Sequence, residues 1–151
     1  MSPKLKKLFY LFLPILLGTI VGFIISPKEY YTNLVKPPLS PPSILFPIMW
    51  TIIYLLMGIS FYILKNNNEM DDTTEKIYYT QLFVNILWSI IFFVFKLKLL
   101  SCLWIILLDI LVIIMVYRFF KKNKLSAYLN FLYVAWILFA TYLTIGIYVL
   151  N

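Results

Sequence analysis

Polar and aromatic side chains share one face of the helix predicted over residues 77–95. Gln81, Asn85 and Trp88 are spaced four and three residues apart, which places all three on the same side of a helix. The residues around them are apolar, and an amide buried in hydrocarbon costs free energy unless it is hydrogen-bonded. We therefore expect this face to point into the interior of a helix bundle.

Two further predicted helices offer an inward-facing tryptophan. Trp50 and Tyr54 lie four residues apart near the start of one helix. The last predicted helix has a similar face, whose members are three, four and four residues apart: Tyr133, Trp136, Ala140 and Thr144. Tryptophans from three helices, together with Gln81 and Asn85, predict a flat apolar cavity with a few polar groups, which suits a large planar hydrophobic ligand.

The composition gives no support for a conventional catalytic site. The chain has no histidine, which removes the common catalytic triads, the commonest metal ligand and the usual proximal haem ligand. Cys102 is the single cysteine, and its apolar neighbours indicate an ordinary packed side chain. We predict no metal site and no required cofactor.

Asp109 lies near the middle of an apolar segment and allows two interpretations. An ionisable group at that depth is a functional candidate, for example in a small transporter of lipophilic or cationic compounds. The alternative is a structural carboxyl group that is hydrogen-bonded to a neighbouring helix. No cationic residue lies within the predicted spans to form a relay with Asp109, which favours the structural interpretation.

The composition is that of an integral membrane protein. Hydrophobic residues make up 63% of the chain and charged residues only 13%, so we predict a single all-α domain over residues 1–151 that is embedded in a lipid bilayer. The net charge of +7 does not predict nucleic-acid binding, because the basic residues form short clusters between apolar runs, where they serve as topological anchors.

Five apolar runs are long enough to cross the roughly 30 Å hydrocarbon core as helices. The first follows three lysines and resembles a signal peptide, but Ser26-Pro27-Lys28 is a poor cleavage site, so we interpret it as a membrane span. Gly18 and Gly22 within it permit close helix approach, either inside the monomer or in a homodimer. The predicted spans are residues 8–26, 43–64, 77–95, 99–117 and 127–150.

A proline-rich loop over residues 27–43 precedes the second span. Proline restricts itself and its predecessor to extended or turn geometry, so this loop is predicted to be a stiff cover rather than a flexible linker. The basic residues divide unevenly between the two sides of the bundle, with nine on the side of the N-terminus and four on the side of this loop. The positive-inside rule then places the N-terminus in the cytoplasm and the loop outside.

The order of these motifs resembles the TspO/MBR family of tryptophan-rich sensory and translocator proteins. The loop and the following helix carry the first set of matching residues: Tyr30-Tyr31, Leu34, Lys36-Pro37, Pro41-Pro42, Pro47, Trp50 and Tyr54. The third span carries the second set: Gln81, Leu82, Asn85, Trp88, Ser89, Phe92 and Phe93. The last span carries the third set: Tyr133, Trp136, Phe139, Ala140 and Leu143.

Three positions depart from the family pattern. Leu39 stands where the family commonly has a second tryptophan in the loop, Thr144 replaces a usual asparagine, and no proline precedes Tyr133. The first departure removes an aromatic ring from the tip of the loop, and the second replaces an amide of the expected pocket with a hydroxyl group.

The resemblance implies a ligand class and a set of binding residues. The expected ligands are porphyrins and other tetrapyrroles, haem-type ligands included, and isoquinoline- or benzodiazepine-like drugs, with roles in porphyrin transport, stress sensing or light-dependent porphyrin breakdown. In the last case, Trp50 and Trp136 would be oxidised by the excited porphyrin. The implied ligand-binding residues are Tyr31, Pro47, Trp50, Tyr54, Gln81, Asn85, Trp88, Phe92, Asp109, Trp136, Phe139 and Ala140. The expected location is a bacterial inner membrane, or the mitochondrial outer membrane in a eukaryote.

Overall fold

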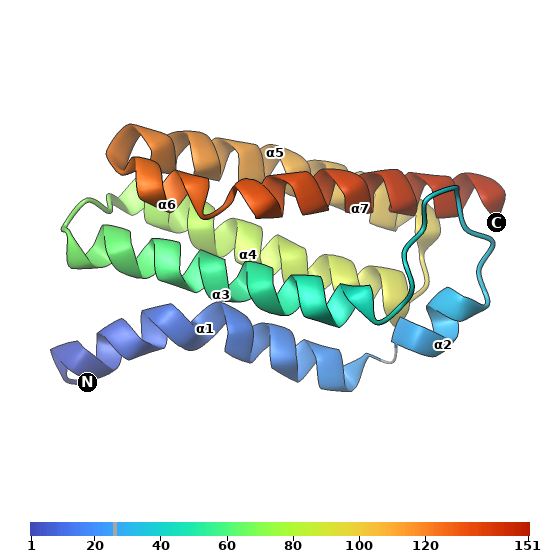
Figure 1. The fold of residues 1–151 in the computed structure, drawn as a ribbon, viewed down its shortest axis with the longest axis horizontal. Helices are drawn as coiled ribbons and strands as arrows, with labels where there is room; N and C mark the ends of the chain where they lie inside the picture. Colours follow the sequence, from blue (N-terminus) through green and yellow to red (C-terminus); the bar gives the residue numbers. More distant parts are fainter. Residues whose placement is uncertain (26) are drawn as a thin grey trace.

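The computed structural model describes residues 1–25 and 27–151, and its helices run side by side in one bundle (Figure 1). Five helical segments in this described part are long and apolar enough to cross a membrane, and no strand occurs in it. The helices are α1 (Pro3–Ile24), α2 (Pro27–Thr32), α3 (Leu45–Asn66), α4 (Asp72–Phe93), α5 (Lys98–Lys122), α6 (Lys124–Tyr128) and α7 (Phe131–Leu150). The chain is a multi-pass, all-helical membrane protein, as the sequence predicts.

The helices form a closed ring, and helices that are neighbours in this ring are not always consecutive in the sequence. α1 packs on α3, α3 on α6 and α7, α7 on α5, α5 on α4, and α4 on α1. The core between them is filled by side chains that are entirely inaccessible to solvent, among them Met57, Phe61, Leu108, Met115 and Ile137. The outer face of α5 instead exposes a row of large apolar residues, including Leu103, Ile106 and Ile110, as expected of a surface in contact with lipid.

Helix caps extend two spans beyond the apolar runs. α1 begins at Pro3 because the Ser2 hydroxyl accepts a hydrogen bond from the Leu5 amide at 3.2 Å. α4 begins at Asp72 because the Asp71 carboxylate accepts one from the Thr74 amide at 2.7 Å. Such caps satisfy backbone donors that the helix leaves unpaired. The helices therefore begin five residues before the predicted span starts at residues 8 and 77.

The predicted single span over residues 127–150 is divided into α6 and α7. Asn130 is buried at the break, and its amide nitrogen donates to the Ser126 carbonyl at 2.9 Å and to the Ser60 hydroxyl at 2.8 Å. Ser126 also donates from its hydroxyl to the Ser60 carbonyl at 3.2 Å. These polar contacts hold the break against α3 and replace helical hydrogen bonds in the interior.

Close backbone approach joins α1 to α3. A methyl group at Gly58 on α3 would overlap the backbone carbonyl of Leu11, and one at Gly18 on α1 would overlap the ring of Tyr54. A methyl group at Gly22 would meet no atom within 4 Å. Gly18 therefore serves packing within the chain, whereas Gly22 lies beside open space. A homodimer stays a prediction.

The proline-rich segment is only partly a loop, because residues 27–32 form α2. The prediction of extended geometry from residue 27 is wrong there, since the clustered prolines begin only at Pro37. Beyond α2 the segment crosses to the end of α7 and returns to α3 (Figure 1). Leu39, within this crossing, has a left-handed backbone with φ 68° and is highly exposed.

Side chains on both sides hold this cover in place. The Tyr31 hydroxyl donates to the Pro41 carbonyl at 2.8 Å, and Lys36 donates to the Tyr31 carbonyl at 3.1 Å. Burial raises the pKa of Tyr31, with an opposing hydrogen bond to Ser40, so the phenol stays a donor at neutral pH. The Lys36 ammonium also lies 5.0 Å from the centre of the Tyr31 ring, a cation–π distance.

Helix α7 provides the other anchor of the cover. The Asn151 side chain accepts from the Val35 amide at 3.0 Å and donates to the Val35 carbonyl at 2.7 Å. The Tyr142 hydroxyl donates to the Pro38 carbonyl at 2.7 Å. The cover is therefore fixed to the bundle by several polar contacts.

Ion pairs gather at the opposite end of the bundle, where the N-terminus lies (Figure 1). Asp71 pairs with Lys122 at 2.5 Å and with Arg118 at 3.6 Å. The hydrogen bond from Lys122 and those from Thr74 hold the pKa of Asp71 well below its usual value.

Two predictions fall outside what the structure describes. The first span was predicted to end at Ser26, which is not among the described residues. The cleavage and charge arguments also used Pro27 and Lys28, whose side chains are not described.

Candidate ligand-binding site

A buried hydrogen-bond network joins α3, α4 and α7. The Asn85 side chain accepts from the Tyr54 hydroxyl at 2.5 Å and donates to the Tyr133 hydroxyl at 2.6 Å. Tyr133 in turn donates to the Gln81 carbonyl oxygen at 2.8 Å, and the Gln81 amide contacts the Met57 sulfur at 3.4 Å. Gln81 and Asn85 are fully buried, so the predicted inward face is confirmed, and both amides are paired within the protein.

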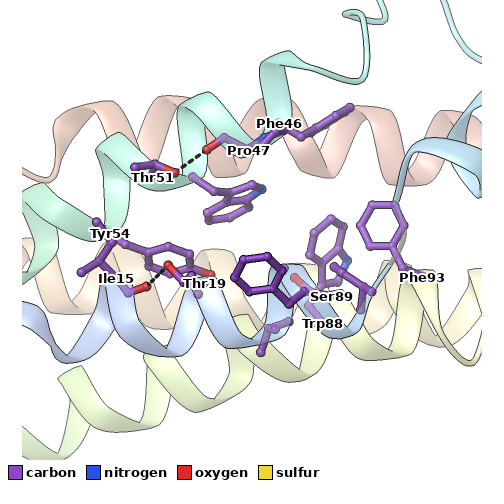
Figure 2. A pocket seen from close by; sticks show the side chains of 15 residues that line it. Ile15, Thr19, Phe46, Pro47, Thr51, Tyr54, Trp88, Ser89 and Phe93 are labelled. Carbon is purple, nitrogen blue, oxygen red and sulfur yellow. Dashed lines mark hydrogen bonds between the residues drawn. The ribbon is translucent and has the colours of Figure 1, made fainter.

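A cavity of about 300 Å³ lies next to this network, between α1, α3 and α4 (Figure 2). We call it the main cavity because aromatic side chains inside the bundle line it. A larger and more open hollow of about 500 Å³ lies beside residues 96–100, Tyr148 and Asn151. Its wall on α1 is made by Ile15, Gly18, Thr19, Val21, Gly22 and Phe23, with Ile25 just after the helix. α3 contributes Phe46, Pro47, Trp50, Thr51 and Tyr54, and α4 contributes Trp88, Ser89 and Phe93. Ligand pockets of roughly 300–1,000 Å³ are typical, so this cavity is at the small end of that range.

Aromatic rings form a continuous surface along the cavity. The rings of Trp50 and Tyr54 are stacked, with centroids 5.5 Å apart and planes inclined by 27°. Trp50 lies 6.5 Å from Trp88, and Trp88 stacks on Phe92 at 5.5 Å. Figure 2 shows the labelled Tyr54, Trp88 and Phe93 around the same space. Such a surface is complementary to a flat unsaturated ligand.

The cavity is open on one side, between α1 and α3. Lining residues on this side are exposed at the outer surface of the bundle, among them Thr19, Gly22, Phe23, Pro47 and Thr51. The Thr19 and Thr51 hydroxyls donate to carbonyls of their own helices at 2.7 and 2.6 Å. This opening therefore presents little free polarity to a lipid-like surrounding.

A second, much smaller cavity of about 20 Å³ lies under the proline-rich cover. It is lined by Tyr31, Phe46, Trp88, Phe92, Phe93, Ala140, Leu143, Thr144 and Ile147. Phe46, Trp88 and Phe93 also line the main cavity, and Phe46 packs edge-on against Tyr31 at 4.9 Å. The cover is thus connected to the main cavity through Phe46.

The structure separates the predicted binding residues into groups. Pro47, Trp50, Tyr54 and Trp88 line the main cavity, whereas Tyr31, Phe92 and Ala140 line the smaller one. Gln81 and Asn85 belong to the network beneath Tyr54. Trp50 and Trp88 share the main cavity, whereas Trp136 lines neither of these two cavities, so its part in a common pocket stays a prediction.

Trp136, Phe139 and Asp109 line neither cavity. The Trp136 ring is buried against Phe46 at 5.9 Å and Phe139 at 5.7 Å. One carboxylate oxygen of Asp109 accepts from the Thr141 hydroxyl at 2.7 Å, and the other has no hydrogen-bond partner. Asp109 therefore joins α5 to α7, as the structural interpretation of this residue expects.

The contribution of α1 to the site was missed in the sequence. Gly18, Thr19, Gly22 and Phe23 line the main cavity, although the two glycines were interpreted only as a packing motif. The glycine spacing signals space beside a helix, but nothing local indicates whether a partner helix or a ligand fills that space. Ser89, next to Trp88 on α4, also lines the cavity and had been used only as part of the family pattern.

The described part of the chain has no group of three or more histidine, cysteine, aspartate or glutamate side chains that could hold a metal ion. Cys102 is buried, and its sulfur lies 3.6 Å from the Thr144 carbonyl as a weak donor. It behaves as a packed side chain.

Comparisons with known proteins agree with the arrangement of motifs. The sequence pattern of the TspO/MBR family matches residues 10–150. The chain is 40% identical over 127 residues to the tryptophan-rich protein TspO of Archaeoglobus fulgidus, covering 83% of this chain and 82% of that protein. It is 34% identical over 155 residues to the tryptophan-rich protein TspO of Chlorobaculum tepidum, covering 97% and 98%. It is 32% identical over 133 residues to protein CrtK of Rhodobacter capsulatus, covering 86% and 83%.

Proposed function

The chain belongs to the TspO/MBR family, and from this premise we propose that it binds tetrapyrroles and similar flat hydrophobic molecules in the cavity between α1, α3 and α4. Membership supports a sensory or transport role in a membrane. Binding of the ligand is the first step of either role.

The aromatic wall of the main cavity is the observation that carries this proposal. Trp50, Tyr54 and Trp88 offer ring faces to one space, and stacking on an aromatic side chain stabilises a bound planar ring by roughly 1–3 kcal/mol. The network through Asn85 fixes the Tyr54 hydroxyl at 2.5 Å, so this wall is held in place before a ligand arrives. A preorganised site loses less entropy on binding.

The volume of the cavity limits how a large ligand is held. A space of about 300 Å³ is at the lower bound for drug-sized ligands. A tetrapyrrole therefore places one edge in the cavity beside Trp50 and Trp88, and the remainder occupies the opening between α1 and α3. Smaller isoquinoline- or benzodiazepine-like molecules enter more fully.

The proline-rich segment acts in this proposal as the cover of the site. Its prolines restrict the backbone, and its contacts with Asn151 and Tyr142 fix it to α7. Packing of Tyr31 on Phe46 couples it to the main cavity. Such a cover slows the release of the ligand without adding many direct contacts.

Porphyrin binding is tested by titrating the protein in lipid nanodiscs with protoporphyrin IX and following the quenching of tryptophan fluorescence. Removing a stacking ring with Trp50→Ala should weaken binding about tenfold, which is about 1.4 kcal/mol. Trp104→Ala is the matched control, because Trp104 lines neither cavity and its indole donates to the Val84 carbonyl at 2.9 Å. Equal weakening by the two variants would contradict the proposed site.

Transport of lipophilic or cationic compounds is the second candidate function. It rests on Asp109, a carboxyl group within a span whose second oxygen has no partner. The test is uptake driven by a proton gradient into proteoliposomes. Uptake that is abolished in Asp109→Asn supports transport, whereas tight porphyrin binding without any flux supports binding alone.

A photochemical role depends on the tryptophans near the ligand. Trp50 lines the main cavity and Trp136 lies beyond Phe46, so the two would differ in their contact with an excited porphyrin. A homodimer and a location in a bacterial inner membrane, with the N-terminus in the cytoplasm, remain predictions that accompany this proposal.

A further inference from the structure

The polar groups that line the main cavity differ in whether they are still free to hydrogen-bond a ligand. Among the described residues, no lysine, arginine, aspartate or glutamate lines this space. The hydroxyl protons of Thr19, Thr51 and Tyr54 are already donated to oxygens of the protein, at 2.7, 2.6 and 2.5 Å. An ionised group entering the cavity would therefore lose its water without gaining an opposite charge.

Three donors on residues that line the cavity make no hydrogen bond in the described structure. They are the indole nitrogens of Trp50 and Trp88 and the hydroxyl of Ser89. An indole N–H donates and cannot accept, whereas a serine hydroxyl can do both. The free hydrogen-bonding capacity of the wall is thus biased toward donors, and it is complementary to a ligand that carries an acceptor.

Trp88 differs from the other two because it is shielded from solvent. Its side chain is 5% exposed and its Nε1 atom is buried without a partner, whereas Trp50 and Ser89 are only half-buried. Buried donors in folded proteins are nearly always paired, and an unpaired one calls for an explanation. The Trp88 side chain borders both cavities. Its Nε1 atom has almost no accessible surface, so a ligand supplies the acceptor once its edge displaces a neighbouring side chain.

We propose that the indole N–H of Trp88 determines ligand specificity by donating a hydrogen bond to an acceptor on the edge of an uncharged, planar ligand. This inference rests on the proposed function and adds the chemical class of the inserted edge. Ring nitrogens and carbonyl oxygens fit that class. Carboxylates and cationic groups of a larger ligand stay outside, in the opening between α1 and α3.

A matched set of bicyclic probes tests this assignment. Naphthalene, quinoline and N-methylquinolinium have similar flat shapes, but only quinoline carries a neutral acceptor, and only N-methylquinolinium is charged. Binding of each to the protein in lipid nanodiscs is measured by competition with protoporphyrin IX. The three probes are compared between wild type, Trp88→Phe and Trp104→Phe, because the ratio of affinities for one probe cancels its partition into lipid.

Quinoline is the probe that should respond to Trp88→Phe. Phenylalanine keeps an aromatic ring and removes only the donor, so quinoline should bind about tenfold more weakly, whereas naphthalene and N-methylquinolinium should change less than twofold. Trp104→Phe removes a donor that is satisfied by the Val84 carbonyl and should leave all three probes unchanged. Equal losses for quinoline and naphthalene in Trp88→Phe would overturn the proposal, as would the failure of quinoline to compete at all.

Indole proton NMR provides a second readout in the wild-type protein. The chain has four tryptophans, so the four indole N–H signals can be assigned through the other three Trp→Phe variants even if Trp88→Phe does not fold. Quinoline should shift the Trp88 signal downfield and naphthalene should not. Protoporphyrin binding combined with an unmoved Trp88 signal would reject the donor role and leave the proposed function standing.

Discussion

Replacing Gly146 with alanine should detach the proline-rich cover from α7 while leaving the bundle folded. A methyl group at this position would lie 2.6 Å from Cγ and 2.7 Å from Cβ of Pro37. Alanine is a better helix former than glycine by about 1 kcal/mol, so α7 itself gains rather than loses stability. The strain therefore falls on the contact between the helix and the cover.

The displacement can be worked from the contact distances. Ordinary van der Waals contact begins near 3.4 Å, so the Pro37 ring must move by about 0.8 Å, the difference between 3.4 and 2.6 Å. The same movement lengthens the 2.7 Å hydrogen bond from Tyr142 to the Pro38 carbonyl to about 3.5 Å, which is beyond a useful length. It also strains the two bonds between Asn151 and Val35.

Each hydrogen bond stabilises a folded state by about 0.5–1.5 kcal/mol net. Losing one bond and weakening two others should cost the closed cover about 1.4 kcal/mol, which corresponds to a tenfold change. Stopped-flow release of a fluorescent porphyrin from nanodiscs measures this directly. We expect the dissociation rate to rise about tenfold in Gly146→Ala, with an unchanged helical circular dichroism spectrum.

Two further variants separate the cover from other effects. Tyr142→Phe removes one of the three bonds and should raise the dissociation rate by only a fewfold. Replacing residues 36–42 with a glycine–serine linker of equal length removes the stiffness as well, and should raise the rate at least as much as Gly146→Ala. A dissociation rate within twofold of wild type in both Gly146→Ala and the linker variant would refute the reasoning and make this segment a mere connector.

Three more results are expected. Asn85→Leu should lower the free energy of unfolding by about 1–3 kcal/mol, because it leaves the buried Tyr54 hydroxyl without an acceptor. The Tyr133 hydroxyl loses the bond from Asn85 but still donates to Gln81. Thermal melting in detergent measures this, and an unchanged free energy of unfolding would contradict it. The folded-state pKa of Asp71 lies below its ordinary value of 3.8, so its contribution to stability is present above about pH 4 and is lost as the pH falls. Asp71→Asn should therefore flatten the acid side of a plot of unfolding free energy against pH. An unchanged plot would argue against the ion pair. Under illumination with protoporphyrin, Trp50→Phe should slow the bleaching of the porphyrin more than Trp136→Phe does, because Trp50 lines the main cavity and Trp136 does not. Equal bleaching by wild type and both variants would reject a photochemical role.

Periodicity in the sequence was sufficient to predict which faces are buried. Gln81, Asn85 and Trp88 are all buried as predicted, and so are Tyr133 and Trp136. In a membrane helix the cost of exposing an amide to lipid is large, so the spacing of polar residues reports the inward face directly. Helix ends were less predictable, because they depend on single side chains such as Ser2 and Asp71, which extend a helix beyond its apolar run.

The location of the cavity could not be read in the same way. Three inward tryptophans predicted one shared pocket, but Trp136 is directed into the contacts of α7 with its neighbours, and α1 supplies the wall that was expected from α7. The proline content predicted a stiff cover, yet not its attachment to Tyr142 and Asn151, more than a hundred residues further along the chain.

The sequence by itself determined a five-span helical membrane protein, the inward face of each of three helices and the family to which the chain belongs, because these depend on composition and on spacing within one helix. Only the tertiary structure decided which faces meet, since the ring order places α1 beside α3 and α4. That choice depends on contacts such as Gly58 against Leu11 and Gly18 against Tyr54. Close approach at Gly18 and open space at Gly22 come from the same residue type on the same helix, and only the neighbouring helices distinguish a packing contact from the wall of a cavity.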